Sequence, residues 1–385
     1  MAAEIDTSAN DHSAQLQQAV EAARSARQPL AISGNGSKNF LSPPVTGLTS
    51  LSTTEHRGVM TYEPTELVVT ARAGTPLQEL QTTLAESGQM LPFEPPSYAN
   101  DDTLGGVIAC GLSGPRRPYS GSARDYVLGV RVLNGQAESL RFGGEVMKNV
   151  AGYDVARLQV GARGTLGLLL DISLKVLPLP EREATTVIEL DQADDLSLVN
   201  SLARRPLPLS ASAIIDRHCY LRFSGSEAAV SRALSEIGGS DLDSAGADQT
   251  ASHFWASLSN QQHTFFAAMA APATLWRVSV PAYAPALAGV SGQWLYEWGG
   301  AQRWLISRDP AESVFKAAAA AGGYATAWRV GDAALDTAAL RYQPLQGVTL
   351  RLHQRLRQAF DPLGLFNPGR YHVGLDGQSR QAGGV

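Results

Sequence analysis

Apolar positions in the first half of the chain alternate between helical and strand periods. In residues 13–28 and 74–88, apolar side chains recur three to four positions apart, which predicts two amphipathic helices. Residues 29–33 and 65–71 are short apolar stretches between polar ones and predict strands. This order indicates a domain that mixes helices with strands.

The predicted helix at 74–88 has signals at both ends. Thr75 and Gln78 have the spacing of a capping box, and Pro76 suits the first helical position. Gly88 can end the helix. We therefore expect Thr75 to cap this helix.

Residues 126–133 and 138–142 predict two strands joined by a hairpin turn at Asn134-Gly135, since this dipeptide favours tight hairpins. In residues 168–176 apolar and polar side chains alternate, which predicts a strand with one buried face and one wetter face. The polar positions of that strand are Asp171, Ser173 and Lys175.

The second half of the chain predicts another mixture of strands and helices, after a boundary at Pro178 and Pro180. The predicted strands are 185–190, 212–216, 219–225, 276–281, 293–298 and 302–307, and the predicted helices are 226–238, 246–269 and 310–323. A last helix at 347–364 is predicted to turn one apolar stripe inward. That stripe consists of Val348, Leu352, Leu356 and Phe360.

Composition narrows the class of protein. Hydrophobic residues make up 44% and charged residues 17% of the 385 residues, which supports a sizeable core and excludes global disorder. The net charge of -5 is spread along the chain, so we expect no nucleic-acid partner. We find no apolar run that spans a bilayer and no signal-peptide pattern, and we expect a cytoplasmic protein.

Cysteine usage excludes some redox chemistry. Cys110 and Cys219 are far apart in the sequence, which argues against a disulfide framework and an iron–sulfur cluster. We expect no metal site, and any redox chemistry must use an organic cofactor.

The first glycine-rich segment, "GNGSK" at residues 34–38, directly follows a predicted strand. A dinucleotide fingerprint would need glycine in place of Asn39, and the first glycine of a P-loop is missing. Free backbone amides beside Ser37 and Lys38 could still hold a phosphate, as in a backbone nest. The alternative is an ordinary turn after a strand.

The segment at residues 103–129 combines glycines with Arg116, Arg117 and Arg124. Its apolar part, "VIACGL", is expected to be buried, and buried glycine-rich backbone needs hydrogen-bond partners that a ligand can supply. Arg124 beside Asp125 is alternatively a structural ion pair. With a third small-residue segment at 161–169, the pattern favours a cofactor that contains a diphosphate.

Several segments together resemble the FAD-binding fold of the p-cresol methylhydroxylase and vanillyl-alcohol oxidase type. They are "GNGS", "TELVVTARAGTPLQEL", "TLGG", "GSARDYVLGVRVL", "KNVAGYDVARLQVGARGTLGLL" and "FDPLGLFNPGR". The stretches "EVMKNVAGYD", "GARGTLG" and "WGGAQRWL" carry a narrower resemblance, to the FAD-binding (E) subunits of bacterial glycolate oxidases. The resemblance extends from about residue 28 to residue 372.

The resemblance implies an α+β fold in two domains. Residues 13–182 would form a two-part FAD-binding domain, and residues 183–345 a smaller α+β domain with an antiparallel sheet plus helices. Residues 346–373 would form the C-terminal helix and an "NPG" return to the first domain. We expect residues 1–12 and 374–385 to be disordered.

The resemblance also implies which residues bind FAD. The first loop corresponds to Gly34, Asn35, Gly36 and Ser37, and the second to Thr103, Leu104, Gly105 and Gly106, continued by Gly111, Ser113 and Gly114. The turn that follows corresponds to Gly121, Arg124 and Asp125, the adenine side to Gly164, Thr165, Leu166 and Gly167, and the C-terminal return to Asn367. The first loop has no histidine for covalent attachment, so we expect non-covalent FAD; Cys110 is more plausibly a small buried residue than an attachment site.

The function that the resemblance implies is that of an FAD-binding subunit in a multisubunit glycolate oxidase. The complex would oxidise glycolate to glyoxylate, with a catalytic FAD-containing subunit and an iron–sulfur subunit that passes electrons toward the membrane. The chain would reach the inner face of the cell membrane only through the complex.

Two alternatives stay open from the sequence: a self-sufficient FAD-dependent 2-hydroxy-acid or alcohol oxidase, and a flavin-bearing structural subunit without a substrate site. A scaffold without flavin and an NAD dehydrogenase are weaker interpretations. The "HxGDGN"-like stretch of related dehydrogenases is missing, which argues against a substrate site of the chain's own, and the catalytic residues are unknown. Arg303 and Arg329, each beside a tryptophan, could bind a carboxylate, although cation–π packing or a surface role is the favoured interpretation. Tyr371 and His372 could approach the flavin.

Overall fold

The computed structural model describes residues 10–144, 153–192, 196–243, 250–333 and 336–375. Its first half is built around a five-stranded sheet in the order β3-β4-β8-β6-β7, in which all neighbours are antiparallel. The strands are β3 (Val59–Glu63), β4 (Val68–Arg72), β6 (Val127–Leu133), β7 (Ser139–Gly143) and β8 (Leu168–Lys175). The strands predicted from the sequence in this region are confirmed.

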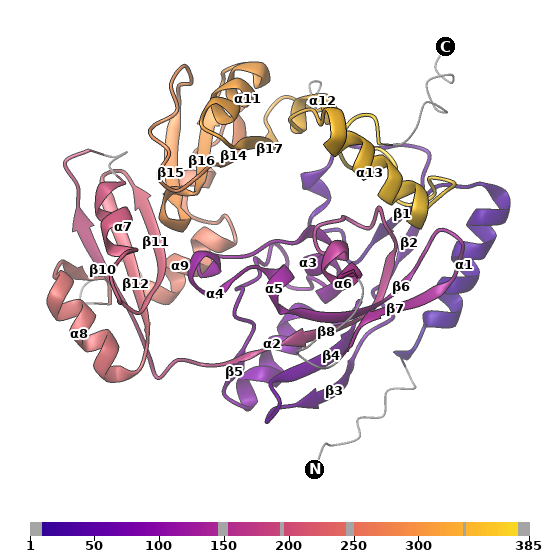
Figure 1. Ribbon diagram of the computed structural model, residues 1–385, viewed down its shortest axis with the longest axis horizontal. Coiled ribbons are helices and arrows are strands. Elements are labelled where there is room, and N and C mark those ends of the chain that lie inside the picture. Colours follow the sequence, from indigo (N-terminus) through magenta and orange to yellow (C-terminus); the bar gives the residue numbers. More distant parts are fainter. Residues whose placement is uncertain (1–9, 145–152, 193–195, 244–249, 334–335, 376–385) are drawn as a thin grey trace.

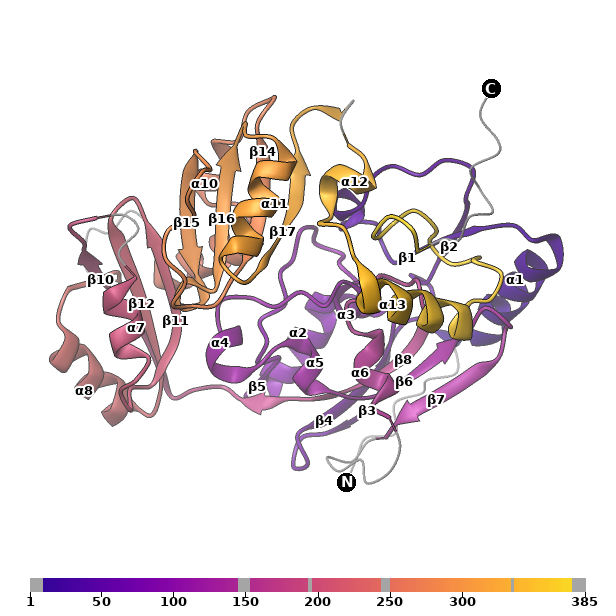
Figure 2. The same cartoon turned by 45° about the horizontal axis from the view of Figure 1, so that its top comes forward.

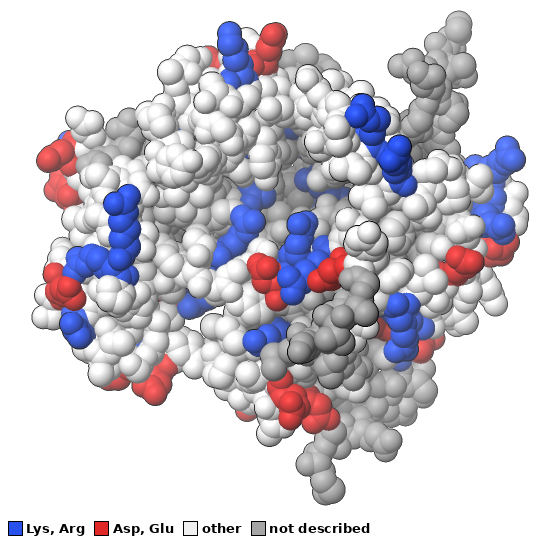
Figure 3. Space-filling model, in the orientation of Figure 1, with Lys and Arg blue, Asp and Glu red and all other residues white. Residues whose placement is uncertain are grey.

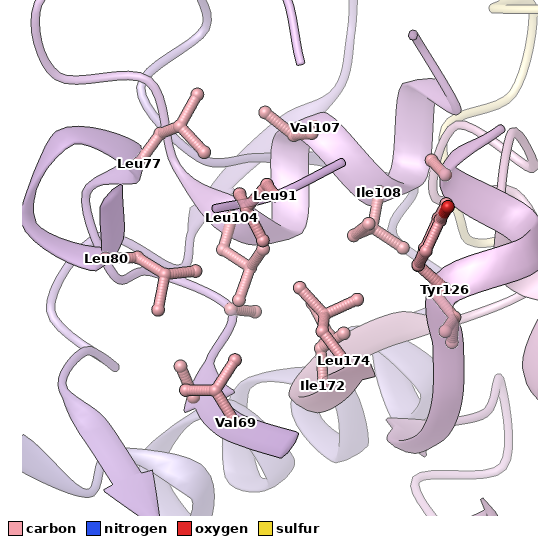
Figure 4. Close-up of a cluster of buried hydrophobic side chains, with 14 of the residues drawn as sticks. Val69, Leu77, Leu80, Leu91, Leu104, Val107, Ile108, Tyr126, Ile172 and Leu174 are labelled. Carbon is pink, nitrogen blue, oxygen red and sulfur yellow. The ribbon is translucent and has the colours of Figure 1, made fainter. Parts of the chain in front are cut away.

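Helices cover one face of this sheet, as Figure 1 shows. They are α2 (Leu77–Glu86), α3 (Leu104–Cys110) and α6 (Val155–Gln159). Leu80, Leu104 and Ile108 from the helices pack on Ile172 and Leu174 of β8, and all five side chains are fully buried (Figure 4). This core fixes the start of α3 beside the ends of the central strands.

The other face carries a second layer. It contains α1 (Ser13–Ala26), the parallel pair β1 (Leu30–Ser33) and β2 (Thr49–Ser52), and the C-terminal return near Phe366. The predicted apolar face of α1 is confirmed, since Leu16, Val20 and Ala23 are buried. A bridge between Leu30 and Phe366 ties the end of the chain to β1.

The second half forms an eight-stranded antiparallel sheet in the order β13-β10-β12-β11-β15-β16-β14-β17 (Figure 2). Its strands are β10 (Arg182–Glu189), β11 (Leu209–Ile215), β12 (His218–Gly225), β13 (Ser240–Asp241), β14 (Thr274–Ser279), β15 (Gln293–Glu297), β16 (Gln302–Ser307) and β17 (Tyr324–Val330). Its helices are α7 (Ser197–Leu202), α8 (Glu227–Ile237), α9 (Ala251–Ser259), α10 (Thr264–Ala267) and α11 (Ala311–Ala320). The predicted α+β class is confirmed, and the domain boundary at residue 182 stays a prediction.

Short elements complete the chain. They are the 3-10 helices η2 (Asn39–Leu41) and η3 (Trp298–Gly300), the strands β5 (Gln89–Met90) and β9 (Leu177–Pro178), and the helices α4 (Arg117–Ser120), α5 (Ala123–Tyr126), α12 (Ala338–Arg341) and α13 (Gly347–Phe360). The termini expected to be disordered lie mostly outside the described residues.

The predicted capping box of α2 is wrong. Helix α2 begins at Leu77, Pro76 is its N-cap residue, and no side chain caps it. The Thr75 hydroxyl instead accepts a hydrogen bond from the Gly58 amide (2.9 Å) and lies near its carbonyl oxygen (3.2 Å). Thr75 is fully buried, so a tertiary contact takes the hydroxyl that the local pattern assigned to the helix.

The hairpin between β6 and β7 is confirmed, but its turn differs from the prediction. Asn134 to Glu138 form the loop, and the left-handed residue is Ala137 (φ 61°). Gly135 serves another purpose, because a Cβ there would lie 2.6 Å from the Asp361 carboxylate. The glycine thus permits close approach of the segment after α13.

Strand β8 has no wetter face, contrary to the alternating pattern. Asp171 and Ser173 are both buried, because the layer with α1 and β1 covers part of the second face. Asp171 pairs with Arg131 and His56, and the Ser173 hydroxyl is 2.8 Å from that of Thr70. At these positions the polar side chains are satisfied by one another and not by water.

Helix α13 turns only part of its predicted stripe inward. Val348 and Leu352 are 61% and 52% exposed, whereas Leu356 and Phe360 are half-buried and the Phe360 ring makes an edge contact with Phe142 (6.2 Å between ring centres). The buried residue of the helix is Arg357, whose guanidinium donates to the Phe366 carbonyl (2.9 Å). The second half of the stripe and this contact with the return segment together hold the helix.

Candidate functional site

A cavity lies where five segments of the first domain meet, and we call it the glycine-rich cavity. The segments are the end of β1, the loop after it, the first turns of α3, the residues before β8 and the C-terminal return. It contains about 770 Å³ of empty space, part of it open to solvent. The residues assigned to FAD that line it are Gly34, Asn35, Gly36, Ser37, Thr103, Gly105, Gly106, Gly164, Gly167 and Asn367.

The loop after β1 presents unused backbone donors to the cavity. In the part of the chain that the structure describes, the amides of Asn35, Gly36 and Ser37 donate to no protein acceptor. Gly36 has φ 76°, the left-handed region that glycine favours. Gly34 touches Thr103 so closely that a Cβ would lie 2.0 Å from its hydroxyl oxygen. Glycine at these two positions brings the loop amides to the cavity wall.

Helix α3 forms a second wall. Thr103 caps the helix by accepting a hydrogen bond from the Gly106 amide (3.2 Å). Gly105 is tight against β4, since a Cβ would lie 2.7 Å from the Ala73 Cβ. A Cβ on Gly106 would meet only the Thr103 hydroxyl, at 3.1 Å, so this position faces open space. The two glycines therefore have different roles: Gly105 packs and Gly106 leaves room.

The cavity is electropositive. Lys38, Arg163 and Arg370 line it, and among the described residues no aspartate or glutamate does. Lys38 pairs with Asp102 (2.9 Å), whereas no carboxylate among the described residues forms an ion pair with either arginine. Figure 3 shows basic side chains in the hollowed centre of the molecular face. Unused amides and unbalanced positive charge suit the diphosphate of a dinucleotide.

The C-terminal return closes the cavity. The Asn367 side chain accepts from the Ile32 amide (2.7 Å) and donates to the Arg163 carbonyl (2.8 Å). Its side chain therefore holds two cavity walls together and its hydrogen-bonding groups are used internally. The Arg163 guanidinium donates to the Leu41 carbonyl (2.9 Å) and lies 5.2 Å from the Tyr342 ring.

Other residues assigned to FAD lie away from this cavity. Leu104 is in the core, a Cβ on Gly111 would lie 2.9 Å from Gly161, and Thr165 and Leu166 are buried.

Ser113 and Gly114 line a second cavity between the domains. Gly121 and Asp125 line a shallow pocket beside Arg117, with Asp125 capping α5. Arg124 is exposed and donates to the Val160 carbonyl (3.2 Å), so the alternative of an ion pair with Asp125 does not form.

Arg116 does not face a ligand, contrary to one sequence-based possibility. It is 8% exposed and pairs with Glu94 (3.0 Å) and with Glu183. Since Glu183 belongs to β10, this arginine connects the first domain to the eight-stranded sheet of the second.

The candidate catalytic residues occupy structural positions. Arg303 is fully buried and donates to the carbonyls of Gly300, Ala284 and Pro285. Arg329 lies over the Phe40 ring (5.0 Å), as the packing interpretation expects. Tyr371 and His372 pack on Tyr342 outside the residues that line the glycine-rich cavity, and burial lowers the pKa of His372 to about 4.

Two important residues have no signal in the sequence motifs. Asp102 is 1% exposed and holds the Ser37 hydroxyl and the Lys38 ammonium, which orients the first loop. Arg370 lines the cavity and donates to the Ile32 carbonyl (3.0 Å). Asp102 directly precedes the "TLGG" motif, and Arg370 directly follows the "NPG" motif. These positions beside the motifs are the signal by which the two residues could have been found.

Comparisons with known proteins indicate a chain that binds FAD. A family model described as an FAD binding domain matches residues 9–143. The chain is 45% identical to glycolate oxidase subunit GlcE of Escherichia coli (strain K12) over 365 residues, which cover 95% of this chain and 99% of that protein. Over 136 residues it is 32% identical to glycolate oxidase subunit GlcD of Bacillus subtilis (strain 168), covering 35% of this chain and 29% of that subunit.

A solved structure supports the fold alone. The 4-ethylphenol oxidase from Gulosibacter chungangensis superposes with a TM-score of 0.69 at 16% identity, over 94% of this chain and 88% of that chain. The FAD binding domain and the glycolate oxidase relatives define an FAD-dependent oxidoreductase, and its fold is of the p-cresol methylhydroxylase type. Within that class, the chain belongs to the family of glycolate oxidase subunit GlcE. Among the described residues, no helix is long and apolar enough to cross a membrane.

Proposed function

We propose that this chain is the FAD-binding subunit of a multisubunit glycolate oxidase and that FAD binds without a covalent bond in the glycine-rich cavity. The amides of Asn35, Gly36 and Ser37, with Arg163 and Arg370, would hold the diphosphate. Bound FAD supplies hydride or electron acceptance and transfer. The observation that carries the proposal is a set of amides without a described protein acceptor, in a cavity that described cations line and no described acid does.

Cys110 supports the non-covalent mode. It lines the cavity, and burial raises the pKa of its thiol. A neutral thiol is a poor nucleophile, so attachment of the flavin to Cys110 is disfavoured.

The partners follow from the family. Because one relative is subunit GlcE and another is subunit GlcD, a catalytic FAD-containing subunit is the proposed partner. An iron–sulfur subunit completes the proposed relay, and membrane association at the cytoplasmic side would come only through the complex. This chain's cysteines, Cys110 and Cys219, belong to separate core clusters and cannot form such a relay centre.

The test is the visible spectrum of the purified chain without oxygen, before and after adding glycolate. We expect a flavin spectrum that persists as oxidised flavin, with the flavin released on denaturation by acid. A protein that stays colourless after incubation with FAD would contradict the proposal. Bleaching by glycolate, with peroxide formed in air, would instead support the self-sufficient oxidase.

A further inference from the structure

A second cavity lies between the two domains, and we call it the interdomain cavity. Tyr98, Ser113 and Gly114 of the first domain line one side. Arg277, Trp304 and Trp328, on strands β14, β16 and β17, line the other, and the empty space, part of it open to solvent, is about 320 Å³. The cavity is separate from the one that carries the unused loop amides.

Arg277 is a cation without a counter-ion in this cavity. Its guanidinium carbon lies 5.2 Å from the Trp298 ring and 5.2 Å from the Trp328 ring, and its Nε donates to the Gln302 side chain (2.6 Å). Among the described residues, no carboxylate makes an ion pair with it, and burial lowers its pKa. Holding a charge there is costly unless an anion compensates it.

Glu297, the acidic residue of this cavity, is engaged elsewhere. One of its carboxyl oxygens accepts from the Gln302 amide (2.9 Å) and the Trp304 indole (2.5 Å). Burial raises the pKa of Glu297, while the nearby Arg277 guanidinium acts to lower it. Glu297 makes no ion pair with Arg277, because the Gln302 side chain stands between them and hydrogen-bonds to both.

Further donors and positive charge surround the cavity. The indole N–H of Trp328 is buried and has no acceptor among the described residues. The Arg117 guanidinium carbon lies 4.4 Å from the centre of the Trp298 ring, the same ring against which Arg277 packs. The Trp298 indole itself is used, because it donates to the Gly114 carbonyl (3.1 Å) and so ties the two walls together.

We propose that the interdomain cavity binds the carboxylate of a small 2-hydroxy or 2-oxo acid, with Arg277 as its cationic ligand and the Trp328 indole N–H as a second donor. The choice of glycolate as first probe rests on the proposed function; the carboxylate class rests on the unbalanced guanidinium. No described histidine lines this cavity, so the described part of the site would bind an acid without supplying an imidazole base.

The experiment is a titration of the FAD-loaded full chain, followed by tryptophan fluorescence, since Trp304 and Trp328 line the cavity. Glycolate and glyoxylate should give a saturable change, and uncharged ethylene glycol should give none. Arg277→Met should weaken glycolate binding about ten- to hundredfold, the range expected for hydrogen bonds to a charged group. Arg277→Lys should retain part of the affinity.

Arg329→Gln is the matched control, because it removes the same charge from the same sheet outside the cavity. It should bind glycolate as the wild type does. The proposal is overturned if no acid gives a saturable change, if Arg277→Met binds normally, if both variants lose binding equally, or if inorganic sulfate competes as well as glycolate.

Folding and flavin content separate this proposal from the previous one. If Arg277→Met does not fold, Trp328→Phe serves instead, since it removes the indole N–H and keeps an aromatic ring; normal binding by that variant would overturn the second-donor role. A chain that holds FAD but binds no acid contradicts only the interdomain site. A chain that binds acid but never FAD contradicts only the proposed function.

Discussion

At the residue scale, adjacent glycines in the second loop make different contacts. Gly105 packs on Ala73, whereas Gly106 faces the open cavity. The sequence placed both beside the diphosphate for one reason, the absence of a side chain. In the structure, Gly105 is needed for packing and Gly106 is needed to leave room for the ligand. The two effects can be measured separately.

Gly106→Leu should lower the flavin content strongly while leaving the folded chain intact, because the new side chain extends into the cavity. Gly105→Leu should lower both flavin content and stability, because it displaces α3 from β4. Flavin absorbance per protein and urea unfolding of the apoprotein provide the two readouts. Normal flavin content in Gly106→Leu would contradict the placement of the cofactor.

Asn367→Asp should destabilise the chain and weaken FAD binding. The new carboxylate no longer donates to the Arg163 carbonyl, and an orphaned buried group costs about 1–3 kcal/mol in free energy of unfolding. Asn35→Asp is the control, because Asn35 is exposed on the first loop and its side chain makes no described hydrogen bond. That variant should weaken FAD binding alone, and equal loss of stability in both would refute the role of Asn367.

At the scale of elements, α2 and α13 show how far an apolar stripe predicts burial. Leu77, Leu80 and Leu84 of α2 are buried as the spacing predicts. Val348 and Leu352 of α13 have the same spacing and are exposed. The spacing identifies the helix in both cases, but only the surrounding sheet supplies a surface for the stripe to cover.

The double variant Val348→Ser/Leu352→Ser should change the free energy of unfolding by less than about 1 kcal/mol, since exposed substitutions are nearly neutral. Leu80→Ala, at a fully buried site in α2, should cost about 2–5 kcal/mol. Urea unfolding of the isolated chain gives both values. A large loss in the α13 variant would show that the helix packs by this stripe after all.

The charged pair on strands β6 and β8 makes stability depend on pH. Burial by itself would raise the pKa of Asp171, but hydrogen bonds from His56 and Arg131 outweigh it and hold the pKa below the ordinary 3.8. A carboxyl with a lowered pKa stabilises the fold above its unfolded pKa, and this contribution disappears as the pH falls through the folded value.

Asp171→Asn should therefore be less stable than the wild type at pH 7, and the difference should shrink as the pH falls below about 4. Urea unfolding across this range measures it. Glu21→Gln, in an exposed pair with Arg24, should differ little from the wild type throughout. A difference between Asp171→Asn and wild type that does not vary with pH would exclude the ion pair as its cause.

At the scale of the whole molecule, a charged cluster joins the two domains. Glu94 of the first domain pairs with Arg116 (3.0 Å) and with Arg222 of β12 (2.8 Å), and Arg116 also reaches Glu183. The cluster fixes how the second sheet sits over the first domain. The interdomain cavity depends on that placement, because its walls come from both domains.

Glu94→Gln should cost about 3–5 kcal/mol, because it leaves two largely buried guanidinium groups short of a counter-charge. Glu236→Gln, which breaks an exposed pair with Arg205, should cost less than about 1 kcal/mol. Thermal unfolding compares the two, and limited proteolysis between β9 and β10 reports loosening of the domains. Equal effects would mean that the cluster does not hold the interface.

Local rules predicted many of the helices and strands and a cofactor that contains a diphosphate. They did not predict β3, β17 or α3, and the described part of the predicted helix at 246–269 is divided into α9 and α10. Helical and alternating periods, together with the glycines at 34, 36, 105 and 106, predicted many of the elements and the loops that line the glycine-rich cavity. These features depend on neighbouring residues in the chain, so the sequence alone carries them. It stays a prediction that all the residues assigned to FAD contact the cofactor when it is bound.

Contacts between distant residues settled the rest. Thr75 bonds Gly58 instead of its own helix, Asp102 orients the first loop, and Arg277 packs between two tryptophans with no ion pair to any described residue. Each depends on which segments the fold brings together, over separations that no local pattern encodes. Burial changes the cost of a charge or an unused donor, and burial exists only once the sheets and helices have packed.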